Sequence, residues 1–159
     1  MKKKSWQERL FAVSFMKKEK VRIIRSRMNL SGQRVLDVGC AQGVVSMMLK
    51  GNDQTWVHLD PDFANLPVAR PVLGPVLIHN AGLSLPFADD SFDDVLLLDI
   101  LEHVDDDRAL LTEAVRVLRP GGRAAVSTPI SGGFFLFNRL KKCFGLTPEI
   151  YGHKREGYS

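Results

Sequence analysis

The chain has 159 residues, enough for one domain with a substantial hydrophobic core but not comfortably for two. Hydrophobic residues make up 45% and charged residues 25%, and no apolar run approaches the ~20 residues of a membrane span, so the composition indicates a globular protein and excludes a transmembrane one. The net charge is a modest +4, and the two isolated cysteines, Cys40 and Cys143, exclude a disulfide framework or a zinc site defined by cysteine spacing.

In chain order, the sequence predicts helices first and then strands alternating with helices. Residues 5–28 combine apolar and basic side chains in a pattern that predicts one or two amphipathic helices. Helices are also predicted at 44–50 and 106–118, the second ended by Pro120-Gly121-Gly122, whereas Pro67, Pro71 and Pro75 predict that any helix among them is short. Apolar runs predict five strands, at 34–39, 55–60, 75–80, 94–99 and 123–128.

This alternation predicts an α/β fold, a doubly wound parallel sheet with right-handed connections. In such sheets, ligands bind beyond the carboxyl ends of the strands, where the strand order reverses. We therefore expect the functional residues to follow directly after the strands.

Polar and glycine residues do follow three of the predicted strands. Gly39 and Gly43 allow a sharp turn and close approach of a ligand to the backbone, Asp60 can accept both hydroxyls of a ribose, and Asn80-Ala81 can meet an adenine. Each feature alone also has a structural explanation: tight strand-to-helix packing, a solvated aspartate in a turn, and a turn asparagine.

At this point the chain resembles the class I, methyltransferase type 11-like family, and the resemblance runs in order from about Arg34 to Pro129. Five blocks carry it: Val-Leu-Asp37-Val-Gly39-Cys-Ala-Gln-Gly43, His-Leu-Asp60-Pro-Asp, Leu85-Pro-Phe-Ala-Asp-Asp-Ser-Phe-Asp93, Leu101-Glu-His-Val104 and Leu118-Arg-Pro-Gly-Gly122. A nicotinamide cofactor fits less well, because its G-x-G-x-x-G fingerprint is absent from the first turn.

The resemblance implies a Rossmann-like sheet of strand order 3-2-1-4-5 and the cofactor S-adenosylmethionine. The methionine part would lie at the first turn and near Asp99, the ribose at Asp60 and the adenine at Asn80 and Ala81. The family usually has glycine where this chain has Ala41, and more often an acid where it has Asn80. The residues expected at the cofactor are Asp37, Gly39, Cys40, Ala41, Gly43, Asp60, Pro61, Asn80, Ala81 and Asp99.

S-adenosylmethionine is an activated methyl donor, so the protein needs a base only for a poorly ionised acceptor. His103, just beyond the fourth strand, is the candidate base, with a packing or capping role as its alternative. Asp99, Glu102 and His103 also resemble the Glu-x-x-Glu-His of ubiquinone-pathway O-methyltransferases, but aspartate is shorter than glutamate and we predict no metal site.

We expect residues 1–30 to form an amphipathic helical segment, and residues 31–159 the S-adenosylmethionine-binding domain. This domain would lack the carboxyl-terminal strand hairpin implied by the resemblance, because residues 130–159 contain no adequate strand runs. The uncovered fifth strand would favour a homodimer. The predicted function is methyl transfer to a small-molecule or lipid-linked acceptor; the alternative is an inactive cofactor-binding or structural remnant.

Basic clusters near both ends of the chain flank an acidic middle, which suggests an anionic neighbour or simply a solvated face; nucleic acid is the less favoured partner. The aromatic and basic segment 134–146 could lie at an anionic membrane, cover an apolar substrate or pack on its own domain. No apolar stretch follows Met1-Lys-Lys-Lys, so the expected location is cytoplasmic, with a peripheral position at the inner membrane face as an option.

Overall fold

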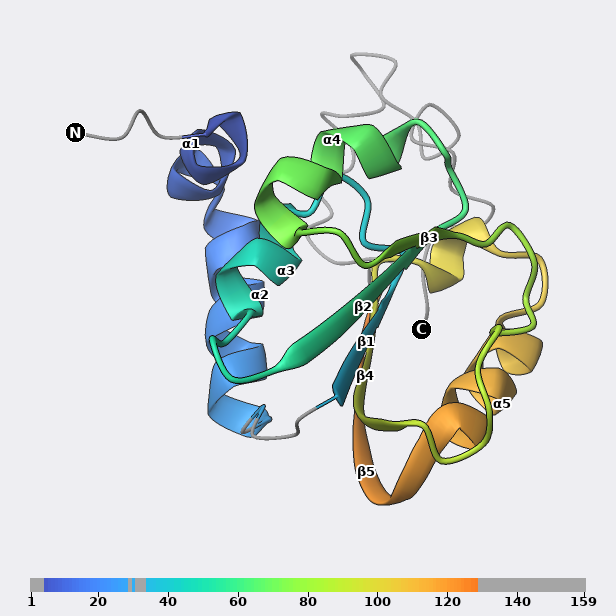
Figure 1. The fold of residues 1–159 in the computed structure, drawn as a ribbon. Coiled ribbons are helices and arrows are strands. Elements are labelled where there is room, and N and C mark those ends of the chain that lie inside the picture. The colour runs from blue at the N-terminus through green and yellow to red at the C-terminus, as the bar shows by residue number, and fades with distance from the viewer. Residues whose placement is uncertain (1–4, 29, 31–33, 129–159) are drawn as a thin grey trace, which may run out of the picture.

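A computed structural model of the chain describes residues 5–28, 30 and 34–128. Figure 1 shows a central sheet with helices on both faces. All the strands are parallel, in the order β3-β2-β1-β4-β5, which confirms the predicted fold class and strand order. The strands are β1 (Arg34–Val38), β2 (Thr55–Asp60), β3 (Leu77–His79), β4 (Phe92–Leu98) and β5 (Leu118–Ser127).

Residues 5–28 form two helices rather than one continuous helix. Ser5 is the N-cap of the first helix and forms a capping box with Glu8. Ser14 is both the C-cap of the first helix and the N-cap of the second. The extended backbone of Ser14 separates the helices, while its side chain accepts a hydrogen bond from the Lys17 amide. These helices are α1 (Trp6–Val13) and α2 (Phe15–Arg27).

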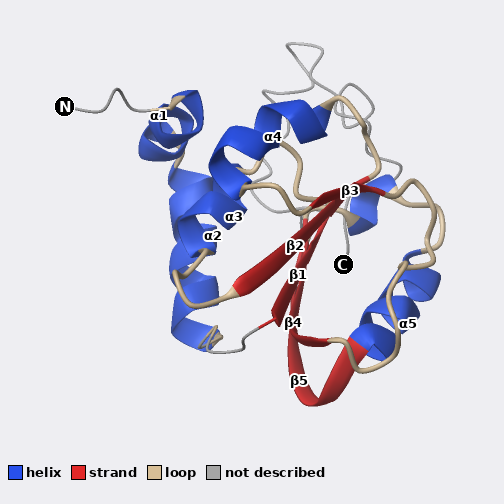
Figure 2. Ribbon diagram, in the orientation of Figure 1, coloured by secondary structure: helices blue, strands red, loops and turns tan. Residues whose placement is uncertain are grey.

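The remaining helices connect the strands and complete two layers around the sheet. Figure 2 shows α2 and α3 on one side of the strands and α5 on the other. The connecting elements are α3 (Val44–Leu49), α4 (Asn65–Leu73), the 3₁₀ turn η1 (Leu101–His103) and α5 (Asp107–Val117). Each helix of the described residues is too short to cross a bilayer.

The two faces of the sheet are buried by different helices. On one face, Val21, Ile24 and Met28 of the α2 region form a core cluster with strand side chains that include Trp56 and Leu96. On the opposite face, η1 and α5 bury another cluster, whose buried strand members are Leu36, Val38, Leu59, Phe92, Val95 and Leu97. All seven residues of β4 are buried, as expected of a central strand covered on both faces.

Some element boundaries differ from the prediction. The fifth strand begins at Leu118 instead of Arg123, because Leu118 pairs with Phe92 and the register then shifts before Asp94 pairs with Arg123. The Pro120-Gly121-Gly122 sequence therefore ends the helix by forming an irregular stretch of strand. The helix α4 spans nine residues: Pro67 lies in the first turn, where its missing amide costs no helical bond, whereas Pro71 lies inside the helix and removes one amide donor.

Residues 129–159 lie outside the described part of the chain. The expectations for the missing hairpin, for segment 134–146 and for Cys143 therefore stay predictions. Within the described residues, β5 pairs only with β4 and is therefore an outer strand of the sheet.

Candidate functional site

The parallel pairing brings the carboxyl ends of four strands to one edge of the sheet. The Val38 end of β1 pairs with Leu59 on one side and Leu97 on the other, while Asp60 pairs with His79. The strand order reverses between β1 and β4, so this edge is the switch point at which doubly wound sheets bind ligands. The candidate residues that follow these ends, including Gly39, Asp60, Asn80 and Asp99, thus share one edge of the sheet.

The loop from β1 to α3 has an unusual backbone. Gly39, Ala41 and Gly43 have φ angles of 80°, 46° and 79°, in the left-handed region that disfavours residues with a side chain. The amides of Gly39 and Cys40 both donate to the Leu59 carbonyl at 2.9 Å, which fixes the loop to the end of β2. Ala41 thus occupies a conformation suited to glycine, the residue that the resemblance places there.

The Asp60 carboxylate connects this loop to the start of the β2–α4 connection. Its Oδ2 accepts a hydrogen bond from the Ala41 amide at 2.6 Å, and its Oδ1 accepts from the Asp62 amide and the Asn65 side chain, both at 2.9 Å. The residue is only 3% exposed. A carboxylate has about four acceptor positions, so Asp60 supports the loop and retains room on Oδ2 for a further donor.

Asn80 orders the turn that follows β3. Its backbone amide donates to the Asp60 carbonyl at 3.1 Å, and its side-chain Nδ2 donates to the carbonyls of Gly82 and Ser84. Its Oδ1 has no hydrogen bond to the described residues, so the amide group presents an acceptor. Ala81, next to it, is exposed.

The segment beyond Asn80 is held by two side chains of α5. Glu113 accepts from the Leu85 amide at 2.9 Å, and Arg116 donates to the carbonyls of Leu85 and Phe87. The adjacent Arg116 lowers the pKa of Glu113 to about 2, and Glu113 in turn raises the pKa of Arg116. This network fixes the Leu85–Asp93 block without contributing to the cofactor residues that we predicted.

Asp37 and Cys40 point into the protein interior. The Asp37 carboxylate, 1% exposed, accepts from Ser46 Oγ at 2.5 Å and contacts His58 Nδ1 at 2.9 Å. Ser46 and His58 both contact the Asp37 carboxylate, and all three side chains are buried. We therefore interpret the three residues as a structural support beneath the loop and not as a nucleophilic triad. Burial, followed by the charges of Asp37 and Asp60, raises the pKa of the Cys40 thiol.

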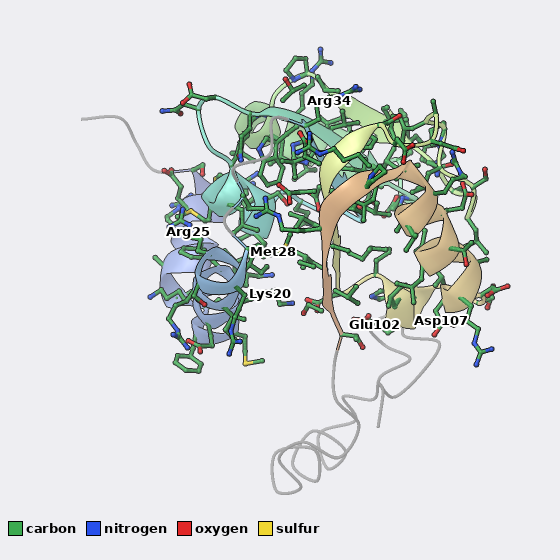
Figure 3. All side chains as sticks on the ribbon, turned by 90° about the horizontal axis from the view of Figure 1, so that it is seen from below. Lys20, Arg25, Met28, Arg34, Glu102 and Asp107 are labelled. Atoms are coloured by element: carbon green, nitrogen blue, oxygen red, sulfur yellow. The ribbon has the colours of Figure 1, made fainter. Side chains whose placement is uncertain are left out.

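Asp99, at the end of β4, has a partner that the sequence did not indicate. Its carboxylate accepts from Lys20 Nζ of α2 and from Ser127 Oγ at 3.2 Å. Figure 3 shows Lys20 between α2 and the sheet. A signal for Lys20 was present in the spacing, since it lies one turn before the buried Ile24.

His103 ends η1, directly after the β4 end, and is half-buried. Its role as a base stays a prediction. Among the described residues, no three His, Cys, Asp or Glu side chains form a group that could hold a metal ion. The alternative set of Asp99, Glu102 and His103 is thus not brought together as metal ligands.

Known proteins match both the sequence and this arrangement. A family model described as a methyltransferase domain matches residues 36–126. An uncharacterized methyltransferase of Mycobacterium avium is 33% identical over 108 residues, which cover 66% of this chain and 43% of that protein. A ubiquinone biosynthesis O-methyltransferase of Pseudomonas fluorescens is 31% identical over 122 residues, which cover 69% of this chain and 50% of that protein.

A solved structure from Thermotoga maritima, a SAM-dependent methyltransferase described as a possible histamine N-methyltransferase, superimposes with a TM-score of 0.69 at 26% identity. The match covers 85% of this chain and 62% of that one. The chain thus spans about half the length of the curated relatives that it matches. Since the family model covers more than half of the chain, the chain belongs to the methyltransferase domain family, whose cofactor is S-adenosylmethionine.

Proposed function

We propose that the protein transfers a methyl group from S-adenosylmethionine to a small-molecule or lipid-linked acceptor by direct displacement. The observation that carries the proposal is the bond between the Ala41 amide and Asp60, which joins the β1–α3 loop to the carboxylate at the neighbouring strand end. This pairing at the switch point provides both a close backbone approach and an acceptor for ribose hydroxyls.

The residues present fit the nucleoside half of the cofactor. Asp60 can accept a ribose hydroxyl through Oδ2, and the Asn80 Oδ1 can accept from the amino group of adenine. When bound, the cofactor supplies a sulfonium-activated methyl group. The chain's own contribution is to orient the two reactants and to exclude water, so no protein nucleophile is required.

The acceptor class is supported by the relatives and by the position of His103. One relative is named a ubiquinone biosynthesis O-methyltransferase, and a hydroxyl acceptor of that kind would need a base. His103 lies in η1, shortly beyond β4, at the same edge of the sheet as the proposed cofactor site. We propose it as the base for a hydroxyl acceptor, with a packing role as the alternative.

A lipid-linked acceptor is supported by exposed side chains at the N-terminal helices. Val13, Phe15 and Met16 are 82%, 75% and 74% exposed around the junction of α1 and α2. Lys17 and Lys18 follow them directly, so apolar and basic groups are combined as in segments that bind anionic membrane surfaces. We propose that this junction contacts anionic lipid.

Cosedimentation with vesicles tests this contact. Vesicles containing phosphatidylglycerol should retain the protein at low salt, and combined Phe15→Ser and Met16→Ser substitutions should reduce retention several-fold. Val115→Ser is the matched control, because Val115 is 68% exposed on α5, away from the basic helices. Equal loss with Val115→Ser, or retention without anionic lipid, would contradict the proposal.

Calorimetry with S-adenosylhomocysteine tests cofactor binding, and a tritiated-methyl screen then separates an active enzyme from an inactive remnant. Asp60→Asn is a better variant than Asp60→Ala, because alanine would leave three N–H groups without their acceptor. We expect Asp60→Asn to weaken binding about tenfold or more, whereas Asp53→Asn, in an exposed turn, should not. Equal affinities of the two variants would contradict the proposed site.

A further inference from the structure

We propose that His58 is a positioning residue of the cofactor site, which acts through Asp37 to hold the β1–α3 loop in its binding conformation. The inference rests on the proposed function, because this loop is where we propose that the cofactor binds. It deepens that proposal by naming a side chain that is 0% exposed and therefore influences a ligand only through its neighbours.

The contact between His58 and Asp37 is the first step. The two residues are Cα partners in the parallel pairing of β1 with β2, and His58 Nδ1 lies 2.9 Å from Asp37 Oδ2. The same oxygen accepts a hydrogen bond from Ser46 Oγ at 2.5 Å. Since Oδ2 is the acceptor in that bond, we assign the hydrogen of the second contact to Nδ1, which donates to the carboxylate.

The other ring nitrogen of His58 is the second step. Nε2 is buried, and no atom of the described residues forms a hydrogen bond with it. Trp56 stacks on the ring, with 5.7 Å between the ring centroids and 21° between the ring planes. An apolar side chain would fill this space without leaving a buried polar atom unpaired. Packing alone therefore does not account for a histidine here, whereas the bond to Asp37 does.

The loop that Asp37 supports is the third step. Asp37 lies on β1 just before the loop and Ser46 lies in the first turn of α3, so their bond joins the two elements across the loop. The N-cap of α3, Gly43, has no side chain to cap the helix, and Ala41 has a left-handed φ of 46°. Such a conformation persists only where surrounding contacts hold it. His58 supplies one of these contacts from β2, because it fixes the carboxylate that also binds Ser46.

Three substitutions that differ in the position of their donor provide the test. The amide nitrogen of asparagine takes the place of Nδ1 and that of glutamine the place of Nε2, whereas leucine has no donor. By calorimetry, His58→Leu and His58→Gln should each weaken binding of S-adenosylhomocysteine about tenfold, whereas His58→Asn should stay within about twofold of the unchanged protein. In an Asp37→Asn background, His58→Leu should have no further effect on this affinity, because the carboxylate through which His58 acts is gone.

Leu36→Val is the matched control for a general loss of stability. Leu36 is fully buried on β1 next to Asp37, but it belongs to the core cluster on the opposite face of the sheet. The substitution should lower the midpoint of urea denaturation and leave the affinity for S-adenosylhomocysteine unchanged.

Three results would overturn the inference: an affinity that His58→Leu leaves unchanged, equal affinities of the asparagine and glutamine variants, or a full additional loss in the Asp37→Asn background. If His58→Leu did not fold, the comparison of asparagine with glutamine would still decide the question. If the unchanged protein did not bind S-adenosylhomocysteine, the proposed function itself would fail.

Discussion

Replacing Gly43 by alanine tests whether the β1–α3 loop depends on this glycine for its conformation and its packing. Gly43 has a φ of 79°, and an added Cβ would lie 2.8 Å from Leu73 Cγ of α4. The left-handed backbone costs an L-residue about 1–2 kcal/mol, and overpacking a well-filled site costs about 1–3 kcal/mol more. We therefore expect Gly43→Ala to lower the free energy of unfolding by about 2–5 kcal/mol, measured by urea denaturation.

Gly121 provides a matched control for the backbone contribution. It has nearly the same φ, 78°, but within the described part of the chain no atom beyond its sequence neighbours lies within 4 Å of an added Cβ. Gly121→Ala should therefore cost only the conformational part, about 1–2 kcal/mol. The difference between the two variants measures the contact with Leu73, and a Leu73→Ala substitution should remove that difference in a double-mutant cycle. If Gly43→Ala were no more destabilising than Gly121→Ala, the packing argument would be refuted.

Other predictions concern charged and thiol groups. Because Arg116 lowers the pKa of Glu113 from 4.5 to about 2, the ionised carboxylate stabilises the fold above pH 4.5, and this contribution is lost as the pH falls toward 2; Glu113→Gln should flatten that acid-side loss in thermal melts, and an unchanged profile would contradict it. Arg123→Met leaves the fully buried Asp94 without its two guanidinium bonds and should destabilise by about 2–4 kcal/mol in urea; a loss below about 1 kcal/mol would show that Asp94 finds another partner. Since burial raises the pKa of Cys40, its peptide should stay unlabelled by iodoacetamide in the native protein and become labelled in urea, as read by mass spectrometry; rapid native labelling would contradict the burial.

The sequence predicted the sheet well because its central strands are nearly continuous apolar runs. Phe92–Leu98 is buried throughout and was recognised from residue 94 onward, whereas the start of β5 was misplaced. Proline and glycine normally end a strand, and only the register of β5 against Phe92 shows that Pro120-Gly121-Gly122 continues one. Strand pairing of this kind depends on tertiary contacts that local residue preferences do not contain.

The sequence predicted where the candidate site residues lie in the fold, but not which side chains they contact. The rule that ligands bind at strand ends placed Asp60 and Asn80 correctly at one edge of the sheet. It did not show that Asp37 faces His58, because that contact depends on the parallel register of β1 and β2, in which the two residues are Cα partners. Asp37 thus has buried protein partners that the sequence did not show, and its contact with the cofactor stays a prediction.

The N-terminal helices belong to the core as much as to the site, which gives a last prediction. Val21, Ile24 and Met28 are 4%, 6% and 7% exposed against a sheet face that also contains Trp56. Burying three such side chains contributes about 5–9 kcal/mol, a large share of the ~5–15 kcal/mol that stabilises a typical domain. We therefore expect a variant lacking residues 1–30 to lose its cooperative urea transition, and a truncated chain that keeps this transition would contradict the estimate. Because α2 buries one face of the sheet and its Lys20 donates to the Asp99 carboxylate, any change that loosens this helix should weaken the core and release this contact together.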